Sequence, residues 1–414
     1  MKHKKKVIIS IISIILIAVI ITGVYLYYIE GQNNKGMTLI NASTTTTTTS
    51  SQEKNIDWSK YETYDLTLNN KTETITKEGV YNVTGSISNG SININTEGNI
   101  KLILNTVSIT NSNGPANLVE NAKNTYIELK GTNKISATTN ETEDGAIFSH
   151  DDLFFGGSGS LTITSNYDGI VSKDALTFYN GSYTIKAEDD GIRGKDSVAI
   201  KDGTYNITTT GKAIKSTNET EIDKGTITIE GGTFTINSKD DAIHINSEVV
   251  ISDGKFTIKT EDDGIHADGK VTIKTGILNI TAQEGIAATY VKIEGGTTSI
   301  IASDDGINAT SKSNQYDVLV EITGGNVTIK MGQGDTDAID SNGKLYITGG
   351  TIDITANSPF DYDGESKFTG GTVTVNGEKV SSLQNQMMGG AGRNNMQGRP
   401  DANNQNNRIK QSNM

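Results

Sequence analysis

Residues 262–283 read DDGIHADGKVTIKTGILNITAQ, and this stretch contains one complete repeating unit of the chain. It holds three short runs rich in β-branched residues, separated by corners that contain Gly or Asp and can supply positive φ angles. None of these runs is long enough for a helix. Only 3 prolines occur among 414 residues, so few backbone donors are lost from a strand ladder. The unit therefore predicts three short strands joined by tight corners.

The opening phrase of this unit, Asp-Gly-Ile or a close variant, returns at a nearly fixed interval. Most steps between its apolar markers are 21 to 23 residues, and three are 29 to 32. Three strands per coil of about 22 residues predict an all-β parallel β-helix, whereas a leucine-rich repeat would need regularly spaced leucines. The markers are Leu118, Ile147, Ile170, Ile192, Ile214, Ile243, Ile265, Ile286, Ile307 and Ile339.

The pleat of the first strand assigns its two faces. If the marker points into the core, the residue two positions later also points inward, and the residue directly after the marker must face solvent. The two later insertions, 216–224 and 310–317, both follow this strand, so we expect two loops that flank its outward face. The predicted outward column is Phe148, Val171, Arg193, Lys215, His244, His266, Ala287, Asn308 and Asp340.

An acidic column lies two residues before the markers, with a second acid beside several of its members. Asp is common at corners, where its side chain bonds to its own backbone, so turn stabilisation is one interpretation. However, carboxylates one strand apart repel by about 1 kcal/mol in water and by about 3 to 4 kcal/mol near a protein surface. Calcium bound between neighbouring coils would offset this repulsion. The predicted Ca²⁺ ligands are Asp168, Asp189, Asp190, Asp240, Asp241, Asp262, Asp263, Asp304 and Asp305.

Cationic and imidazole side chains run beside the acids and form the predicted ligand-binding set. They could balance the carboxylates, or they could receive the carboxylates of an acidic sugar chain. His244 and His266 match across one repeat and could be a solvated stack, because a zinc pair would lack a third ligand at a comparable position. The predicted ligand-binding residues are Lys173, Arg193, Lys195, Lys215, His244 and His266.

The composition of the remaining segments divides the chain into four regions. Four lysines precede an apolar run at 7–29, so residues 1–30 predict a transmembrane anchor, or a signal segment if this part is cleaved. Residues 31–58 predict a Thr-rich polar linker, 59–380 the β-helix, and 381–414 a disordered tail rich in Asn, Gln, Gly and Met. This organisation predicts an extracellular protein anchored to the plasma membrane by its N-terminal helix, or a secreted one after cleavage.

Composition excludes several classes of site. The formal net charge of −13 argues against a nucleic-acid partner, since phosphate binding needs a basic surface. The chain has no Cys, so it has neither a disulfide framework nor a thiolate metal site. Hard cations with oxygen ligands are the metal option that these residues leave.

The repeats also resemble a known family. The segments AIFSHDDL at 146–153, GSLTI at 159–163, DGIVSKDAL at 168–176 and DGIRGKD at 190–196 closely resemble exported bacterial calcium-binding β-helix proteins that bind cellulose and polygalacturonate. This resemblance covers residues 65–380 and implies a right-handed, pectate-lyase-like β-helix with calcium held by loop carboxylates. The phrase Lys212-Ala213-Ile214 departs from the Asp-Gly-Ile pattern of that family and argues against a metal at that coil.

Together these features favour a monomeric cell-surface module that binds acidic polysaccharides, and possible cellulose binding follows from the resemblance. The alternatives are a calcium-dependent polysaccharide lyase and a structural adhesin. Lyase chemistry would need Ca²⁺ and a base of lowered pKa, for which Lys173, Arg193, Lys195 and Lys215 are the well-placed candidates. No residue is assigned a catalytic role from the sequence.

Overall fold

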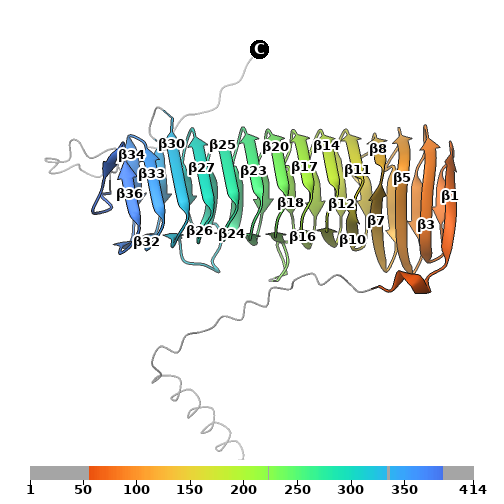
Figure 1. The fold of residues 1–414 in the computed structure, drawn as a ribbon, viewed down its shortest axis with the longest axis horizontal. Helices are drawn as coiled ribbons and strands as arrows, with labels where there is room; N and C mark the ends of the chain where they lie inside the picture. Colours follow the sequence, from red (N-terminus) through yellow and green to blue (C-terminus); the bar gives the residue numbers. More distant parts are fainter. Residues whose placement is uncertain (1–55, 222, 333–335, 386–414) are drawn as a thin grey trace, which may run out of the picture. The chain divides into compact units, whose positions relative to one another are not determined.

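The computed structural model describes residues 56–221, 223–332 and 336–385. They all belong to one unit that extends from Asn55. They form an all-β parallel solenoid of about 14 turns with about 22 residues per turn (Figure 1). Within these residues there is no helix with the length and apolar composition that a bilayer span requires. The predicted anchor at 1–30, most of the linker and residues 386–414 of the tail lie outside the described residues.

Each regular turn contributes one strand to each of three parallel sheets, as predicted. The first sheet contains β2 (Glu73–Ile75), β4 (Ile92–Asn95), β6 (Asn117–Asn121), β9 (Gly145–Ser149), β12 (Asp168–Ser172), β15 (Ile192–Gly194), β18 (Ile214–Ser216), β21 (Ile243–Ile245), β28 (Ile307–Ala309), β31 (Asp337–Ser341), β34 (Ser358–Tyr362) and the first parts of β24 (Ile265–Ile273) and β26 (Ile286–Ile293).

The second and third sheets complete each turn. The second contains the remaining parts of β24 and β26 with β7 (Asn124–Lys130), β10 (Leu153–Gly157), β13 (Ala175–Phe178), β16 (Ser197–Ile200), β19 (Thr226–Ile229), β22 (Glu248–Ile251), β29 (Leu319–Ile322), β32 (Lys344–Ile347) and β35 (Ser366–Phe368). The third contains β8 (Thr132–Ala137), β11 (Ser160–Ser165), β14 (Ser182–Ala187), β17 (Thr204–Thr209), β20 (Thr233–Ser238), β23 (Lys255–Thr260), β25 (Ile277–Ala282), β27 (Thr297–Ala302), β30 (Asn326–Met331), β33 (Thr351–Thr355) and β36 (Thr372–Val375).

The two ends of the solenoid depart from this pattern. The first turns use longer strands, β1 (Thr63–Asn69), β3 (Gly79–Ile87) and β5 (Asn99–Asn111), and the short 3-10 helix η1 (Trp58–Lys60) precedes them. At the other end, β37 (Glu378–Lys379) folds back antiparallel on β36. Leu383 is buried, and its carbonyl accepts a hydrogen bond from the Tyr362 hydroxyl. The first residues after 380 therefore pack on the last turn.

The marker isoleucines lie in register through the regular turns. Ile170 pairs with Ile192, Ile192 pairs with Ile214, and the series continues through Ile243 to Ile339. All of these side chains are fully buried, as are the small residues two positions later. The predicted faces of this strand are therefore confirmed for its inward positions.

Two expectations for this strand were wrong. Leu118 pairs with Phe148 rather than with Ile147, because Asn117 occupies the marker position in β6. Leu118, Phe148 and Val171 point away from the core, yet they form a second buried apolar cluster instead of facing solvent. Ala287 is also fully buried. The outward face of the first sheet is therefore covered in places by neighbouring side chains.

The third sheet carries an aromatic stack that we did not predict from the sequence. Ring centroids of Tyr183 and Tyr205 are 5.1 Å apart, those of Tyr205 and Phe234 are 4.8 Å apart, and those of Phe234 and Phe256 are 4.4 Å apart. Neighbouring parallel strands are separated by about 4.8 Å, so aromatic residues in register stack face to face. This stack fills the core along four turns.

We predict that Phe234→Ala strongly destabilises the solenoid, because it removes a fully buried ring from the middle of the stack. The free energy of unfolding should fall by about 3–5 kcal/mol. Ile301→Ala is the matched control, since Ile301 is 51% exposed and should change stability by no more than about 0.5 kcal/mol. Guanidinium unfolding followed by circular dichroism measures both. Equal losses for the two variants would contradict the assigned core.

Candidate functional site

The acidic column joins successive turns through its first carboxylate oxygen. Asp168 Oδ1 accepts the backbone N–H of Asp190 at 3.0 Å, and Asp190 Oδ1 accepts that of Lys212 at 2.8 Å. Asp241 Oδ1 likewise accepts the N–H of Asp263 at 3.1 Å. The four aspartates of these bonds are buried, with exposed fractions of 1% to 7%. Each carboxylate therefore stabilises the corner of the following turn rather than its own turn.

The second carboxylate oxygen takes a cation in the central turns. Arg193 Nε lies 2.6 Å from Asp168 Oδ2, and the guanidinium also bonds Asp144. Lys215 Nζ lies 3.0 Å from Asp190 Oδ2. Arg193 and Lys215 therefore neutralise the acids of the preceding turns, as the charge-balancing interpretation expects.

These contacts shift the protonation equilibria of both partners. Burial raises the pKa of Asp168 to about 7, although the Arg193 charge opposes this shift. Burial alone would lower the pKa of Arg193, but the carboxylates of Asp168 and Asp144 raise it overall. A general base needs a lowered pKa. Arg193 therefore lacks the property that the lyase hypothesis requires of it.

A lysine stands in the column where the phrase Lys-Ala-Ile interrupts the pattern. Lys212 Nζ lies 2.6 Å from Asp240 Oδ2 and 3.9 Å from Asp241 Oδ2. Burial lowers the pKa of Lys212, and the hydrogen bond to Asp240 together with the neighbouring carboxylates raises it overall. An ammonium group therefore already occupies one side of this acidic group.

The two histidines of the outward column bond to acids of their own turns. His244 Nδ1 lies 2.7 Å from Asp241 Oδ2, and His266 Nδ1 lies 2.7 Å from Asp263 Oδ2. Their rings are stacked with centroids 5.0 Å apart. Both side chains are only about one-fifth exposed. The carboxylates thus hold both rings in one orientation, which a freely solvated stack would not have.

The structure brings two groups of predicted calcium ligands together. In each group, one oxygen from each of three carboxylates lies within 4.8 Å of the others, and one member is exposed while another is buried. Burial and neighbouring carboxylates raise the pKa of Asp189 in the first group and of Asp262 in the second. Burial alone would raise the pKa of Asp240 in the second group, but its hydrogen bond to Lys212 lowers it overall. The groups are Asp168, Asp189 and Asp190, and Asp240, Asp241 and Asp262.

Three other predicted ligands lie outside these groups. Asp263 bonds to His266, and Asp304 Oδ2 accepts a hydrogen bond from Gln283 at 3.4 Å. Asp305 Oδ1 accepts the backbone N–H of Asp337 at 3.1 Å. Asp305 therefore continues the same ladder toward the C-terminal turns.

In the C-terminal turns several acids lie close to one another, and burial and like-charge repulsion raise their pKa values. Burial, followed by Glu284 and Asp304, raises the pKa of Asp305 to about 7. Burial, followed by Asp305 and Asp361, raises the pKa of Asp340 to about 7. Sequence reasoning placed Asp340 in the outward column but not among the acids, although Asp340 and Asp361 are register partners. These carboxylates hold protons at a pH where ordinary aspartates are ionised.

Sequence reasoning also missed an acidic column at the next corner. Its members Asp151, Asp174 and Asp196 each follow a marker isoleucine by four residues, a signal that was present in the sequence. Burial raises the pKa of Asp174, and the other two acids contribute to this shift. Asp144 was missed because an extra alanine separates its Asp-Gly pair from Ile147.

The last two predicted cations lie near this corner. Lys173 Nζ lies 5.2 Å from the centroid of the Phe148 ring. The Lys195 side chain is exposed, and its backbone carbonyl accepts a hydrogen bond from the N–H of Asn218 at 2.9 Å. Lys195 therefore stands at the base of the first insertion loop.

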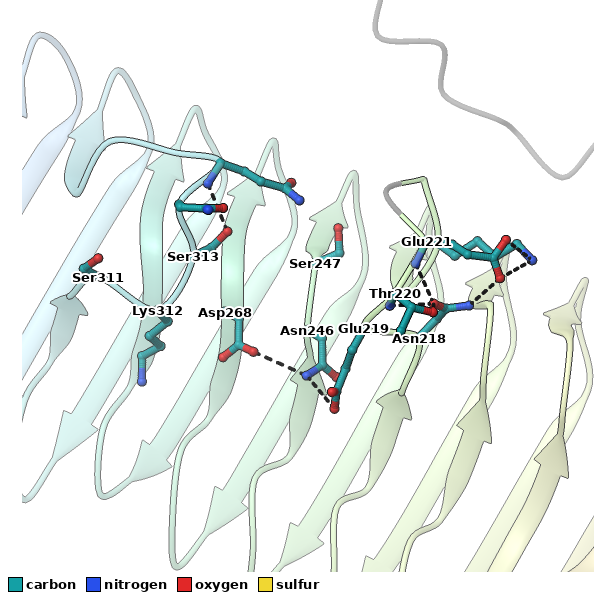
Figure 2. A pocket seen from close by; sticks show the side chains of 13 residues that line it. Asn218, Glu219, Thr220, Glu221, Asn246, Ser247, Asp268, Ser311, Lys312 and Ser313 are labelled. Carbon is teal, nitrogen blue, oxygen red and sulfur yellow. Dashed lines mark hydrogen bonds and ion pairs between the residues drawn. The ribbon is translucent and has the colours of Figure 1, made fainter.

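The two insertion loops flank an open groove of about 850 Å³, and none of the six predicted ligand-binding residues belongs to its lining. Figure 2 shows loop residues 218–221 on one side and 311–313 on the other, with Asn246 and Asp268 between them. Asn246 Nδ2 donates to Asp268 Oδ2 at 3.3 Å and to Glu219 Oε1 at 3.5 Å. The complete lining is Asn218, Glu219, Thr220, Glu221, Lys224, Asn246, Ser247, Asp268, Ser311, Lys312, Ser313, Asn314 and Gln315.

Comparison with known proteins adds family information to this geometry. A sequence model for carbohydrate-binding domain-containing proteins matches residues 69–263 and 261–409. The gadolinium derivative of a polysaccharide lyase-like protein from C. thermocellum is similar, with 28% sequence identity and a TM-score of 0.42. The match covers 53% of this chain and 95% of that chain. No curated protein matches the chain.

We predict that the metal-free protein becomes less stable as the pH rises from about 4 to about 7. The pKa of Asp305 and of Asp340 is about 7 in the folded chain, whereas an unfolded Asp titrates near 3.9. Their stabilising contribution is complete below about pH 4 and is lost as the pH rises through 7. Thermal unfolding in chelator measures this trend. Asp340→Asn should flatten it, and a midpoint that rises with pH would contradict the assignment.

Proposed function

The chain belongs to the family of carbohydrate-binding domain-containing proteins, and we propose that it binds an extended polysaccharide in the groove between its two insertion loops. The groove is the observation that carries this proposal. It is open and polar, and its lining offers amides, hydroxyls and charged groups but no aromatic ring. Sugar hydroxyls both donate and accept hydrogen bonds, so this lining suits a chain of many hydroxyl groups better than a flat apolar ligand.

We further propose that the preferred polymer carries carboxylates. Lys195 at the base of the first loop and Lys312 in the second loop are both exposed, and neither makes an ion pair with another described residue. A uronate chain lying along the groove would offer carboxylates to these two cations. Arg193 and Lys215 are less suited to this role because their charges are already paired with Asp168 and Asp190.

Calcium is the cofactor that we propose for this protein. The group of Asp168, Asp189 and Asp190 and the group of Asp240, Asp241 and Asp262 each offer three carboxylates within reach of one ion. Calcium prefers oxygen ligands and accepts six to eight of them, so water or a uronate carboxylate would complete its coordination. Asp189 and Asp262 are exposed, which leaves each group open to solvent. Burial and neighbouring carboxylates raise the pKa of Asp189 and of Asp262, and a bound ion would offset the repulsion from those carboxylates.

The cellular setting is part of the same proposal. A polymer-binding solenoid held outside the cell by residues 1–30 could reach cell-wall or surrounding polysaccharides, including cellulose. The apolar run and the lysines before it support such an anchor. We propose a monomer with a right-handed coil, since each turn of a solenoid is covered by its neighbours along the chain.

We predict that Ca²⁺ raises the unfolding temperature of the protein, because an ion bound only by the folded state stabilises it by mass action. The double variant Asp189→Asn, Asp262→Asn should lose most of this effect, since Asn keeps the hydrogen-bonding shape and removes one charge from each group. Asp202→Asn, Asp253→Asn is the matched control at exposed corners elsewhere. Calorimetry at several calcium concentrations measures all three proteins. An equal calcium response in the two double variants would place the ions elsewhere.

We predict that Lys195→Glu, Lys312→Glu weakens binding to polygalacturonate by about tenfold, because two exposed charge contacts contribute up to about 1 kcal/mol each. Binding to neutral cellulose should change little. Lys255→Glu, Lys274→Glu makes the same charge change at exposed positions away from the groove and should bind like the unmodified protein. Retention on each polymer is measured with and without Ca²⁺.

The same incubation separates the binding module from the lyase. A lyase would release unsaturated products that absorb in the ultraviolet, whereas a binding module would retain the polymer without any such product. Steady release of product that depends on Ca²⁺ would overturn the proposed function. Equal loss of retention for both charge-reversed pairs would move the binding surface away from the groove.

A further inference from the structure

The stacked histidines of the first sheet form a cluster that differs in chemistry from the two carboxylate groups. His244 and His266 are register partners on β21 and β24. Their rings are 5.0 Å apart with an interplanar angle of 22°. A neutral imidazole has a lone pair that can bind a metal ion.

Carboxylates hold both rings in place. Each Nδ1 lies 2.7 Å from the carboxylate of its own turn, Asp241 for His244 and Asp263 for His266. Carboxylates that bond to metal-ligating histidines orient the rings and increase their basicity. Asp268 Oδ1 also lies 3.6 Å from His266 Nε2. Asp263 therefore serves as the supporting acid of His266, whereas Asp241 Oδ2 would exchange its bond to His244 Nδ1 for a bond to the metal ion.

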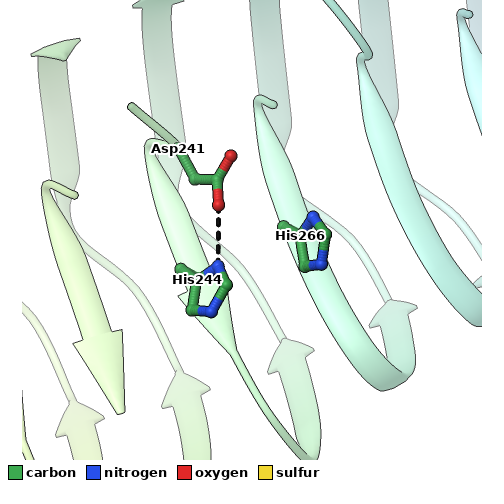
Figure 3. A group of neighbouring side chains, drawn as sticks. All are labelled: Asp241, His244 and His266. Carbon is green, nitrogen blue, oxygen red and sulfur yellow. Dashed lines mark hydrogen bonds and ion pairs between the residues drawn. The ribbon is translucent and has the colours of Figure 1, made fainter. Parts of the chain in front are cut away.

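A third ligand is also present. One ligand atom from each of Asp241, His244 and His266 lies within 4.8 Å of the other two. Figure 3 shows the Asp241 carboxylate directed at the His244 ring, with the His266 ring on the next turn beside it. Ligand atoms around a tetrahedral Zn²⁺ are about 3.3 Å apart, given metal–ligand lengths of about 2.0–2.1 Å. Asp241 is buried, but the two imidazoles are about one-fifth exposed and have room for the small rotation that this contraction needs.

We propose that Asp241, His244 and His266 bind one divalent transition-metal ion, with Zn²⁺ as the probe metal. Two nitrogen ligands and one oxygen ligand suit Zn²⁺, whereas Ca²⁺ prefers oxygen alone. Three protein ligands leave a coordination position open to water or an anionic oxygen. The site stands beside the groove, because Asp268 both contacts His266 and lines the groove.

The proposed site shares Asp241 with one of the two carboxylate groups. An ion held by the histidines would draw Asp241 away from the group that it forms with Asp240 and Asp262. The group of Asp168, Asp189 and Asp190 has no residue in common with it. Zn²⁺ should therefore compete with Ca²⁺ for one group and leave the other unaffected. This inference does not depend on polysaccharide binding.

The test is Zn²⁺ titration of the full-length chain against a chromophoric zinc indicator. The chain has four histidines, so each can be changed separately to Gln. We expect one site that is weakened more than tenfold by His244→Gln and by His266→Gln. His3→Gln and His150→Gln are the matched controls and should leave this site unchanged. Circular dichroism confirms that each variant is folded.

A second measurement needs no variant. Co²⁺ bound to the unmodified chain should show the intense visible absorption of a four-coordinate ion with nitrogen ligands, and Zn²⁺ should abolish it. Absence of this band, or zinc affinity that is unchanged in both His244→Gln and His266→Gln, would overturn the proposal. Loss of binding in His3→Gln or His150→Gln alone would assign the metal to another histidine and would equally overturn it.

Discussion

The hydrogen bond that a backbone N–H donates to the Asp carboxylate of the preceding turn is the interaction on which the rest of this solenoid depends. Asp168, Asp190, Asp241 and Asp305 all make it through Oδ1. Burying a carboxylate is unfavourable unless both of its oxygens are bonded. The second oxygen of each carboxylate therefore also needs a hydrogen-bond or ion-pair partner. How that second oxygen is satisfied determines the chemistry along the column.

In the central turns, the residue directly after the marker isoleucine is the partner of this second oxygen. Long side chains reach back by one turn, so Arg193 bonds Asp168 and Lys215 bonds Asp190. The shorter imidazole of His244 reaches only the acid of its own turn, Asp241. Where the column carries Asp340 instead, this position adds another acid, and burial with like-charge repulsion raises the pKa of Asp340. The residue type at this one position therefore determines which group bonds the acidic column, while the hydrogen bonds between the carboxylates and the backbone N–H groups stay the same.

The sequence was sufficient to predict the repeat, the sheet register of the regular turns and the location of the insertion loops. Those features follow from spacing alone, because a residue 22 positions later occupies the same place on the next coil. The prediction that Leu118 is a marker residue was wrong because the early turns contain an irregular pairing near β6. Spacing therefore no longer determines the face on which a residue lies. The sequence also could not show which acid each cation bonds, because that depends on side-chain length and direction rather than on register.

The groove shows why this architecture can add a binding surface without losing its fold. Each turn of a solenoid contacts only its neighbours, so an insertion at a corner changes the local edge and leaves the ladder intact. Ile214 still pairs with Ile243 across the first insertion, and Ile307 still pairs with Ile339 across the turn that carries the second. Between these loops the turns that contain His244 and His266 keep the regular spacing of 21 to 22 residues. The acidic ladder lies at the corner before the first-sheet strand and the groove at the corner after it, with the histidine pair on the strand between them. The inserted residues extend outward while the hydrogen bonds from backbone N–H groups to the carboxylates keep the turns stacked.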